Sequence, residues 1–302
     1  MSRVARRRVI SERVVTVCVL LGALAGCAAQ RGRIETAVKG PPTPWTQLRV
    51  ADDPDDFHFA VIPDRGGGER PGVFGDAVRK TALLRPAFVM SVGDLIQGYD
   101  ADAAELDRQW DEFAGLIEPL DMPFFRVAGN HDVERPPQAA KWKERFGPSY
   151  YSFTYRGVLF LCLDTQAAGA PRLGDEQIGY FADVLKRHRR PRWTFVFMHW
   201  PVWRREDPAG FERIEALLGE RPYTVFAGHG HEYLLATRNG RQYIQLATAG
   251  GASDVAGVKA GHFDHITSVT MTADGPRIAN LTLDGILPVD VRTAESAAKP
   301  QQ

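Results

Sequence analysis

Five apolar runs of this 302-residue chain each lead into side chains of the kinds that bind metal ions. The side chains are carboxylates, one amide and imidazoles, and no thiol is among them. Such donors suit Mn, Fe or Zn better than a soft metal or an iron–sulfur cluster. One Asp after a strand is usually a helix cap and one His is usually structural, but five such ends together indicate a metal site. The predicted ligands are Asp64, Asp94, Asn130, His199, His229 and His231.

The runs that precede these residues are predicted to be strands of a layered α/β fold. They are too apolar to have a solvated face, and amphipathic stretches typical of helices separate them at 73–84, 103–116, 175–189 and 211–218. Ligand sites of such sheets lie at the carboxyl ends of strands. Two later hairpins, with turns at Asn239-Gly240 and Asp274-Gly275-Pro276, should add antiparallel strands and make the sheet mixed. The predicted strands are 57–62, 88–92, 124–128, 158–163, 193–198 and 224–227, with hairpin strands at 233–237, 242–246, 269–272 and 278–283.

The motifs resemble those of the calcineurin-like metallophosphoesterase superfamily, which run Asp-x-His, Gly-Asp, Gly-Asn-His-Asp/Glu, His and Gly-His-x-His. Four of these five motifs match, and the resemblance covers about residues 57–283. It implies a β-sandwich of mixed sheets flanked by helices, with two metal ions at one edge. By position, the resemblance makes Asp94 the bridge between the metals. It assigns Asn130, His199 and His229 to the second site, and Asp64 and His231 to the first.

The chemistry expected from such a site is hydrolysis of phosphoric esters, either phosphomonoesters or phosphodiesters. Two divalent ions (Mn, Fe or Zn) about 3.5–4 Å apart would hold a hydroxide between them and neutralise charge on the phosphoryl oxygens. Two alternatives stay open. The chain could be a one-metal enzyme, or a phosphate- or partner-binding protein that keeps the fold without turnover.

Two further residues of the third motif are predicted to be catalytic. His131 follows the ligand Asn130, and an imidazole there could protonate the leaving oxygen. Asp132 could orient that imidazole from behind and keep it cationic. The alternative is that His131 only packs or hydrogen-bonds within its loop. Asn130 and His131 are also expected to contact the substrate.

The first motif departs from the family pattern, because it reads Asp64-Arg65-Gly66 and lacks the second ligand. The first site then has only three protein donors, one fewer than a usual four-coordinate site, and should bind its metal more weakly. Arg65 is predicted to bind substrate phosphate, helped by amides of the glycines that follow. The alternative is a glycine turn with a solvated Arg65. A replacement ligand could come from His262, Asp264 or His265, although we expect structural roles for these.

The amino-terminal segment indicates export and lipid anchoring. Several arginines precede an apolar run of 12 residues, Val14 to Ala25, which is too short for the ~20 residues of a membrane span. The run leads into Ala25-Gly26-Cys27 and resembles a bacterial lipoprotein signal. We therefore predict a signal peptide at 1–26, a lipid on Cys27, a flexible tether at 27–50 and a location on the periplasmic or extracytoplasmic face of the cell envelope. An uncleaved anchor or an ordinary secretory peptide is the alternative.

Composition is that of an ordinary globular protein, with 44% hydrophobic and 25% charged residues. Lys plus Arg and Asp plus Glu each number 37, so no net charge favours nucleic acid as a partner. The expected partners are a phosphate-ester substrate and a membrane. The phosphoesterase domain is predicted at 51–290, followed by a loose tail at 291–302.

Overall fold

The computed structural model describes residues 55–166, 171–208 and 210–285. The predicted signal peptide, Cys27, the tether and the carboxyl-terminal tail lie outside these ranges, so the predicted boundaries of the domain stay predictions. Within the described ranges, no helix combines the length and the apolar character that crossing a membrane requires.

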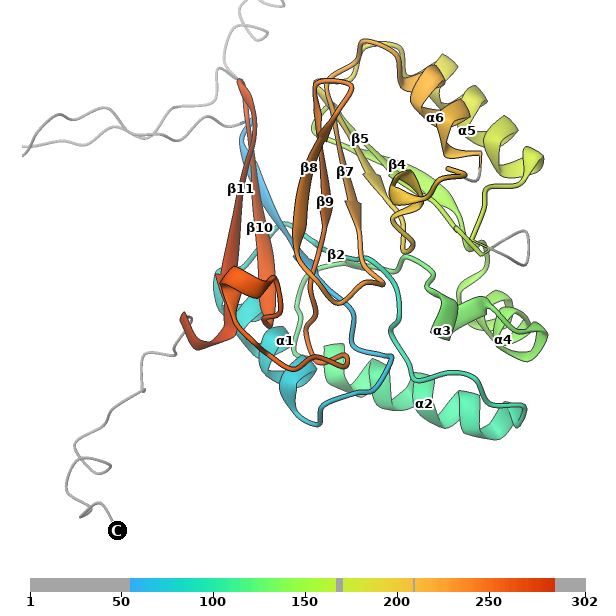
Figure 1. Cartoon of the computed structure of the whole chain (residues 1–302), viewed down its shortest axis with the longest axis vertical. Coiled ribbons are helices and arrows are strands. Elements are labelled where there is room, and N and C mark those ends of the chain that lie inside the picture. The colour runs from blue at the N-terminus through green and yellow to red at the C-terminus, as the bar shows by residue number, and fades with distance from the viewer. Residues whose placement is uncertain (1–54, 167–170, 209, 286–302) are drawn as a thin grey trace, which may run out of the picture. The chain divides into compact units, whose positions relative to one another are not determined.

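Two sheets form the centre of the fold, one with five strands and one with six (Figure 1). The strand order is β11-β10-β1-β2-β3 in the first sheet and β4-β5-β6-β7-β9-β8 in the second. Their bounds are β1 (Phe57–Ile62), β2 (Val89–Ser91), β3 (Phe124–Phe125), β4 (Tyr151–Tyr155), β5 (Val158–Cys162), β6 (Trp193–Phe197), β7 (Tyr223–Ala227), β8 (Leu234–Arg238), β9 (Arg241–Gln245), β10 (His265–Thr272) and β11 (Gly275–Thr282).

Each sheet is mixed, which confirms the predicted fold class. In the first sheet β1 runs parallel to β2 and antiparallel to β10. In the second sheet β5, β6, β7 and β9 form parallel pairs, and β4 and β8 join its edges antiparallel. Both predicted hairpins, β8–β9 and β10–β11, are present.

The structure corrects the predicted strands most clearly in three places. In the second hairpin, β10 begins at His265 and not at residue 269, and Gly275 and Pro276, predicted in the turn, belong to β11. Strand β4 was not predicted; it forms a hairpin with β5 through Arg156-Gly157, whose φ values of 44° and 74° fit a tight two-residue turn. Strand β3 is shorter than the predicted 124–128. Its ladder stops because the Val127 amide donates to the Ser91 hydroxyl, 2.9 Å away, and not to a strand carbonyl.

Helices cover the outer face of each sheet, and an aromatic core fills the space between the sheets. Helices α1, α2 and α4 bury apolar residues against the first sheet, and α5 and α6 do so against the second (Figure 1). Rings of Phe59, Phe88 and Phe160 meet between the sheets with centroids 5.2 to 5.5 Å apart. Of the helices, α3 and α4 were not predicted. The bounds are α1 (Val73–Leu84), α2 (Ala103–Ile117), α3 (Asn130–Val133), α4 (Pro136–Phe146), α5 (Asp175–Arg187) and α6 (Phe211–Leu218).

Candidate metal centre

The six predicted ligands meet at the carboxyl ends of strands from both sheets. Strands β1, β2 and β3 of the first sheet lead to Asp64, Asp94 and Asn130, whereas β6 and β7 of the second lead to the histidines. The sequence did not predict this division between two sheets. Two groups have donor atoms within 4.8 Å of one another, and Asp94 belongs to both. The groups are Asp94, His199 and His229, and Asp64, Asp94 and His231.

Atoms with lone pairs converge on one point beside His199. Its Nδ1 lies 2.8 Å from the Val92 carbonyl and must donate to it, so Nε2 faces the other ligands. Nε2 lies 2.8 Å from Asn130 Oδ1 and 3.2 Å from Asp94 Oδ2. An amide oxygen and a carboxylate oxygen can only accept hydrogen bonds. His229 Nδ1 lies 3.0 Å from the same Asn130 oxygen. A bound cation would satisfy all of these acceptors at once.

Asp64 provides a second sign that a cation belongs here. Its carboxylate is fully buried, and Oδ1 has no hydrogen-bond partner within the described part of the chain. The other oxygen, Oδ2, accepts from the His229 amide at 2.7 Å and lies 3.5 Å from His231 Nε2. A buried carboxylate oxygen without a partner is costly, so the donor set fits a metal ion.

His231 is held in the orientation of a metal ligand by a backbone carbonyl. Its Nδ1 donates to the Ala252 carbonyl at 2.8 Å, which leaves the Nε2 lone pair facing Asp64. Histidines that bind metals commonly donate their other ring N–H to such an acceptor. His199 follows the same rule through Val92.

The backbone around the ligands is strained or closely packed. Asp94, His229 and His231 have positive φ values of 53°, 70° and 49°, which non-glycine residues seldom adopt outside functional sites. Gly129 lies against the bridging position, because a Cβ there would come within 2.2 Å of Asp94 Oδ1. Glycine is therefore required before Asn130 for the second and third strand ends to meet.

The two histidines of the second group differ in charge. Burial alone would lower the pKa of His199, but the nearby carboxylates of Asp94 and Asp64 raise it to about 9. Burial and the positive charge of His199 lower the pKa of His229 to about 3. Burial disfavours the Asp94 carboxylate, yet His199 and His131 hold the pKa of Asp94 below its ordinary value. The carboxylates thus favour a positive charge on His199, next to the place that a cation would occupy.

His131 is oriented toward the site, but not by the residue that was expected. Its Nδ1 lies 2.5 Å from the Gln97 carbonyl and donates to it, while its amide donates to Asp94 Oδ1 at 3.0 Å. The Asp132 carboxylate instead accepts from the backbone amides of Gly129, Leu95 and Ile96 at 2.9 to 3.2 Å. Burial and Asp94 raise the pKa of Asp132 to about 8, and the Gly129 and Leu95 N–H donors oppose that shift. Asp132 therefore joins two ligand loops and does not orient the imidazole.

Arg65 does not lie where a phosphate-binding residue should. Its side chain is 2% exposed, donates to the Leu95 carbonyl at 3.1 Å and pairs with Glu69 and Glu112. A guanidinium occupied by two carboxylates and covered by the fold cannot reach substrate. The prediction that Arg65 binds substrate phosphate is wrong, as is its alternative of a solvated side chain, because the arginine joins the first motif to α2.

The missing ligand of the first motif is excluded by the backbone itself. A Cβ on Gly66 would come within 2.3 Å of the Ile96 carbonyl oxygen. Gly66 also donates its amide to the Asp94 carbonyl at 2.7 Å, so the loop cannot move away without losing this bond. The absence of a His ligand is therefore part of how the loop is built.

Gly66→Ala should lower the free energy of unfolding by about 1–3 kcal/mol, because the added methyl meets rigid backbone. Gly66→His should be at least as damaging and should not tighten metal binding. Gly179→Ala is the control, since Gly179 lies on the exposed face of α5 with no atom within 4 Å of an added Cβ. Urea unfolding and metal titration would measure both effects. A stable Gly66→His protein that gains metal affinity would contradict this account.

The candidates for a replacement ligand have structural roles. His262 pairs with Asp254 at 2.7 Å, and Asp264 forms two bonds with Arg70. His265 is buried and accepts from the Ala247 amide at 3.2 Å. None of the three belongs to either group of candidate ligands among the described residues.

Two residues that support the site were not predicted. Tyr99 accepts from Asn130 Nδ2 at 2.8 Å, which turns the amide oxygen toward the histidines. Trp200 stacks on His229 with ring centroids 3.5 Å apart. Their position next to motif residues could have suggested them, but nothing in the sequence distinguishes them from packing residues.

Comparison with known proteins agrees with this arrangement. A family model described as calcineurin-like phosphoesterase matches residues 56–233. Serine/threonine-protein phosphatase CPPED1 of Bos taurus is 28% identical over 169 residues, which cover 49% of this chain and 54% of that protein. The Mus musculus protein of the same name is 28% identical over 199 residues, covering 56% and 62%. The chain therefore matches little more than half the length of these relatives.

Solved structures share the fold at low sequence identity. Purple acid phosphatase PPD1 from yellow lupin has a TM-score of 0.61 at 15% identity, covering 77% of this chain and 52% of that one. GAP50 of Plasmodium has a TM-score of 0.58 at 14% identity, covering 78% and 87%. A dimetal phosphatase from Danio rerio has a TM-score of 0.52 at 17% identity, covering 75% and 99%. At these identities the likeness is one of fold.

Proposed function

Because this chain belongs to the calcineurin-like phosphoesterase family, we propose that it hydrolyses phosphomonoesters or phosphodiesters at a centre of two divalent metal ions. The observation that carries the proposal is the convergence of metal-ligating atoms in two groups that share Asp94. The buried Asp64 Oδ1, which has no partner among the described residues, and the acceptor oxygens of Asn130 and Asp94 beside His199 Nε2 support it.

The two metal positions would differ in strength. Asp94, Asn130, His199 and His229 would hold the second metal, and Asp64, Asp94 and His231 the first, with one protein donor fewer. When bound, divalent metals would make a water nucleophilic and neutralise charge on the phosphoryl oxygens. The protein side chains position the ester and supply the proton that the leaving oxygen needs.

His131 is the residue best placed to supply that proton. Its Nδ1 is fixed by the Gln97 carbonyl, and its Nε2 lies 3.3 Å from where a Cβ on Gly67 would be, close to His231. His131 and Asn130 are accordingly the substrate-contacting residues that we retain. Arg65 is not among them.

The test is hydrolysis of a nitrophenyl phosphomonoester and diester by the purified full-length protein with Mn²⁺, with and without a chelator. We expect turnover that the chelator removes, and elemental analysis should find up to two metal equivalents per chain, the second bound more weakly. One tight equivalent with full activity would instead support a one-metal enzyme. Bound metal without turnover of either ester would favour a non-catalytic binding protein.

The same assay tests His131 through the leaving group. A nitrophenolate leaves without protonation, but an alkoxide does not, so His131→Asn should slow hydrolysis of an alkyl phosphate by roughly 10²-fold and a nitrophenyl ester much less. An equal loss for both esters would show that His131 acts on something other than the leaving oxygen.

The remaining proposals concern location and partners. We propose that the substrate is a phosphate ester outside the cytoplasm and that a lipid on Cys27 anchors the chain to the cell envelope. The motif Leu24-Ala25-Gly26-Cys27 after a short apolar run supports this. Metabolic labelling with a fatty acid, compared with Cys27→Ser, would detect the anchor, and equal labelling of both would disprove it.

A further inference from the structure

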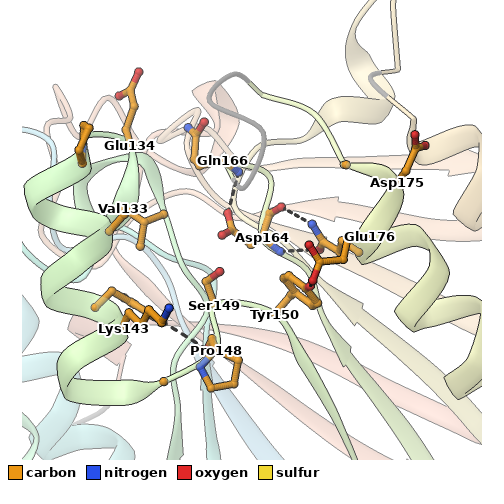
Figure 2. Close-up of a pocket in the computed structure, with 16 residues that line it drawn as sticks. Val133, Glu134, Lys143, Pro148, Ser149, Tyr150, Asp164, Gln166, Asp175 and Glu176 are labelled. Carbon is orange, nitrogen blue, oxygen red and sulfur yellow. Dashed lines mark hydrogen bonds between the residues drawn. The ribbon is translucent and has the colours of Figure 1, made fainter.

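A cavity of about 930 Å³ lies beside the metal centre, between α4 and the start of α5 (Figure 2). Its walls include Val133 and Glu134 at the end of α3, and Asp164 and Gln166 after β5. This volume is far larger than a phosphate group needs. The cavity could therefore receive the part of a substrate that lies beyond the phosphorus.

Two structural links place the cavity next to the ligands. Glu134 lies one helical turn after Asn130, a rise of about 5.4 Å, and its carboxylate accepts from the Tyr99 hydroxyl that holds the Asn130 amide. On the other side, the Trp200 amide donates to the Thr165 hydroxyl at 3.2 Å. Segments that line the cavity are thus directly bonded to segments that carry ligands.

The cavity lining is strongly acidic. Glu134, Asp164, Asp175 and Glu176 line it, and Lys143 is the single lysine or arginine among the described residues that do so (Figure 2). Asp175 is partly neutralised by Arg213. Among the described residues, the Glu176 carboxylate accepts a hydrogen bond only from the Tyr150 hydroxyl, at 3.3 Å. This excess of carboxylate would repel the anionic part of a substrate and attract a cation.

An unpartnered acceptor also belongs to this lining. Gln166 is 5% exposed, and its Oε1 is buried with no hydrogen-bond partner among the residues that the structure describes. A buried amide oxygen without a donor is unfavourable, and a ligand that carries N–H or polarised C–H groups would satisfy it. The aromatic side chains of Tyr150 and Trp142 line the same cavity, and aromatic faces attract organic cations.

We infer that this acidic cavity binds an ammonium or guanidinium group on the alcohol portion of the substrate. The inference rests on the proposed phosphoesterase function and specifies its substrate class, a phosphate ester whose leaving group is cationic. Such a group can come from a small amino alcohol or from a basic residue beside a phosphorylated side chain. The chemistry recognised is the same in both cases.

The test compares matched substrates that differ only in charge. Phosphocholine and its neutral isostere 3,3-dimethylbutyl phosphate form one pair, and a phosphoserine peptide with neighbouring arginines and its citrulline counterpart form the other. We expect kcat/KM to favour the cationic member of at least one pair by roughly three- to tenfold, as expected for partly exposed ion pairs. The pair that responds identifies the source of the cation. No preference in either pair would overturn the inference while leaving the phosphoesterase function standing.

Variants of the cavity provide a second readout. Glu176→Gln should lower kcat/KM of the cationic substrate and so remove most of the cationic preference, because the variant lacks the carboxylate charge that attracts the cation. Asp111→Asn, an exposed carboxylate on α2 paired with Arg145, is the matched control. A preference that survives in Glu176→Gln and in Gln166→Leu would overturn the inference.

Direct binding separates this inference from the proposed function. Calorimetric titration with choline and with 3,3-dimethylbutanol needs no turnover. Choline binding that is lost in Glu176→Gln, in a protein that hydrolyses neither ester, would support the cavity and refute the enzyme. Equal binding of both alcohols would refute the cavity, as would binding of neither alcohol together with no charge preference in the peptide pair.

Discussion

Asp94→Asn should abolish hydrolysis of every phosphate ester, with a loss of at least about 10³-fold in kcat/KM. Asp94 is the one residue shared by both groups of candidate ligands, and a neutral amide removes a negative charge from both positions at once. Several kcal/mol of transition-state stabilisation would be lost, and each 1.36 kcal/mol is tenfold in rate. Steady-state kinetics with a nitrophenyl ester and saturating Mn²⁺ would measure it.

The metal content of the Asp94→Asn variant would show why activity is lost. Asp94→Asn should retain less than one metal equivalent after dialysis, by elemental analysis, while Asp111→Asn should keep the metal content and rate of the unaltered protein. Asp111 is exposed on α2 and pairs with Arg145, away from the ligands. An Asp94→Asn protein that keeps both metals and a substantial rate would refute the assignment of Asp94 as the bridge.

Asp132→Ala should lower the free energy of unfolding by at least about 3 kcal/mol. The carboxylate is fully buried and accepts three backbone N–H groups, from Gly129, Leu95 and Ile96. An alanine leaves all three donors without a partner, and each buried donor left unpaired costs about 1–3 kcal/mol. Asp132→Asn should cost less, because its amide oxygen can still accept two of the three bonds.

Urea unfolding in the presence of a chelator would measure this effect without a contribution from metal binding. Asp121→Asn is a suitable control, because that side chain is 67% exposed and its ion pair with Arg85, at 3.5 Å, lies on the surface. The two loops that Asp132 joins carry Asp94 and Asn130, so metal affinity should fall together with stability. Unchanged stability in Asp132→Ala would mean that solvent replaces the carboxylate at little cost.

These two predictions distinguish the role of Asp94 from that of Asp132. Asp94 faces the metal positions, whereas Asp132 faces backbone amides from two loops. Substitution of the first should remove activity with modest loss of stability. Substitution of the second should reduce stability first, and activity as a consequence.

The sequence by itself was enough to predict the candidate ligands and most of the elements. Strand β1 and helices α1 and α6 match the predicted ranges residue for residue, because a run of apolar residues or a 3.6-residue repeat is a local property. The order of the motifs was enough to predict the fold class. Helices α3 and α4 and strand β4 were missed. Helix α3 has only four residues and depends on the Asp132 carboxylate for its start.

Only the tertiary structure decided which atoms those residues meet. The orientation of Arg65 depends on Glu112, 47 positions away, and that of His131 on the Gln97 carbonyl, 34 positions away. The sequence contains the Gly66 that breaks the motif, but not the Ile96 carbonyl that leaves no room for a side chain there. The physical reason is that hydrogen-bonding and steric partners distant in the chain are selected by how two sheets and their loops pack, and no local pattern encodes that packing.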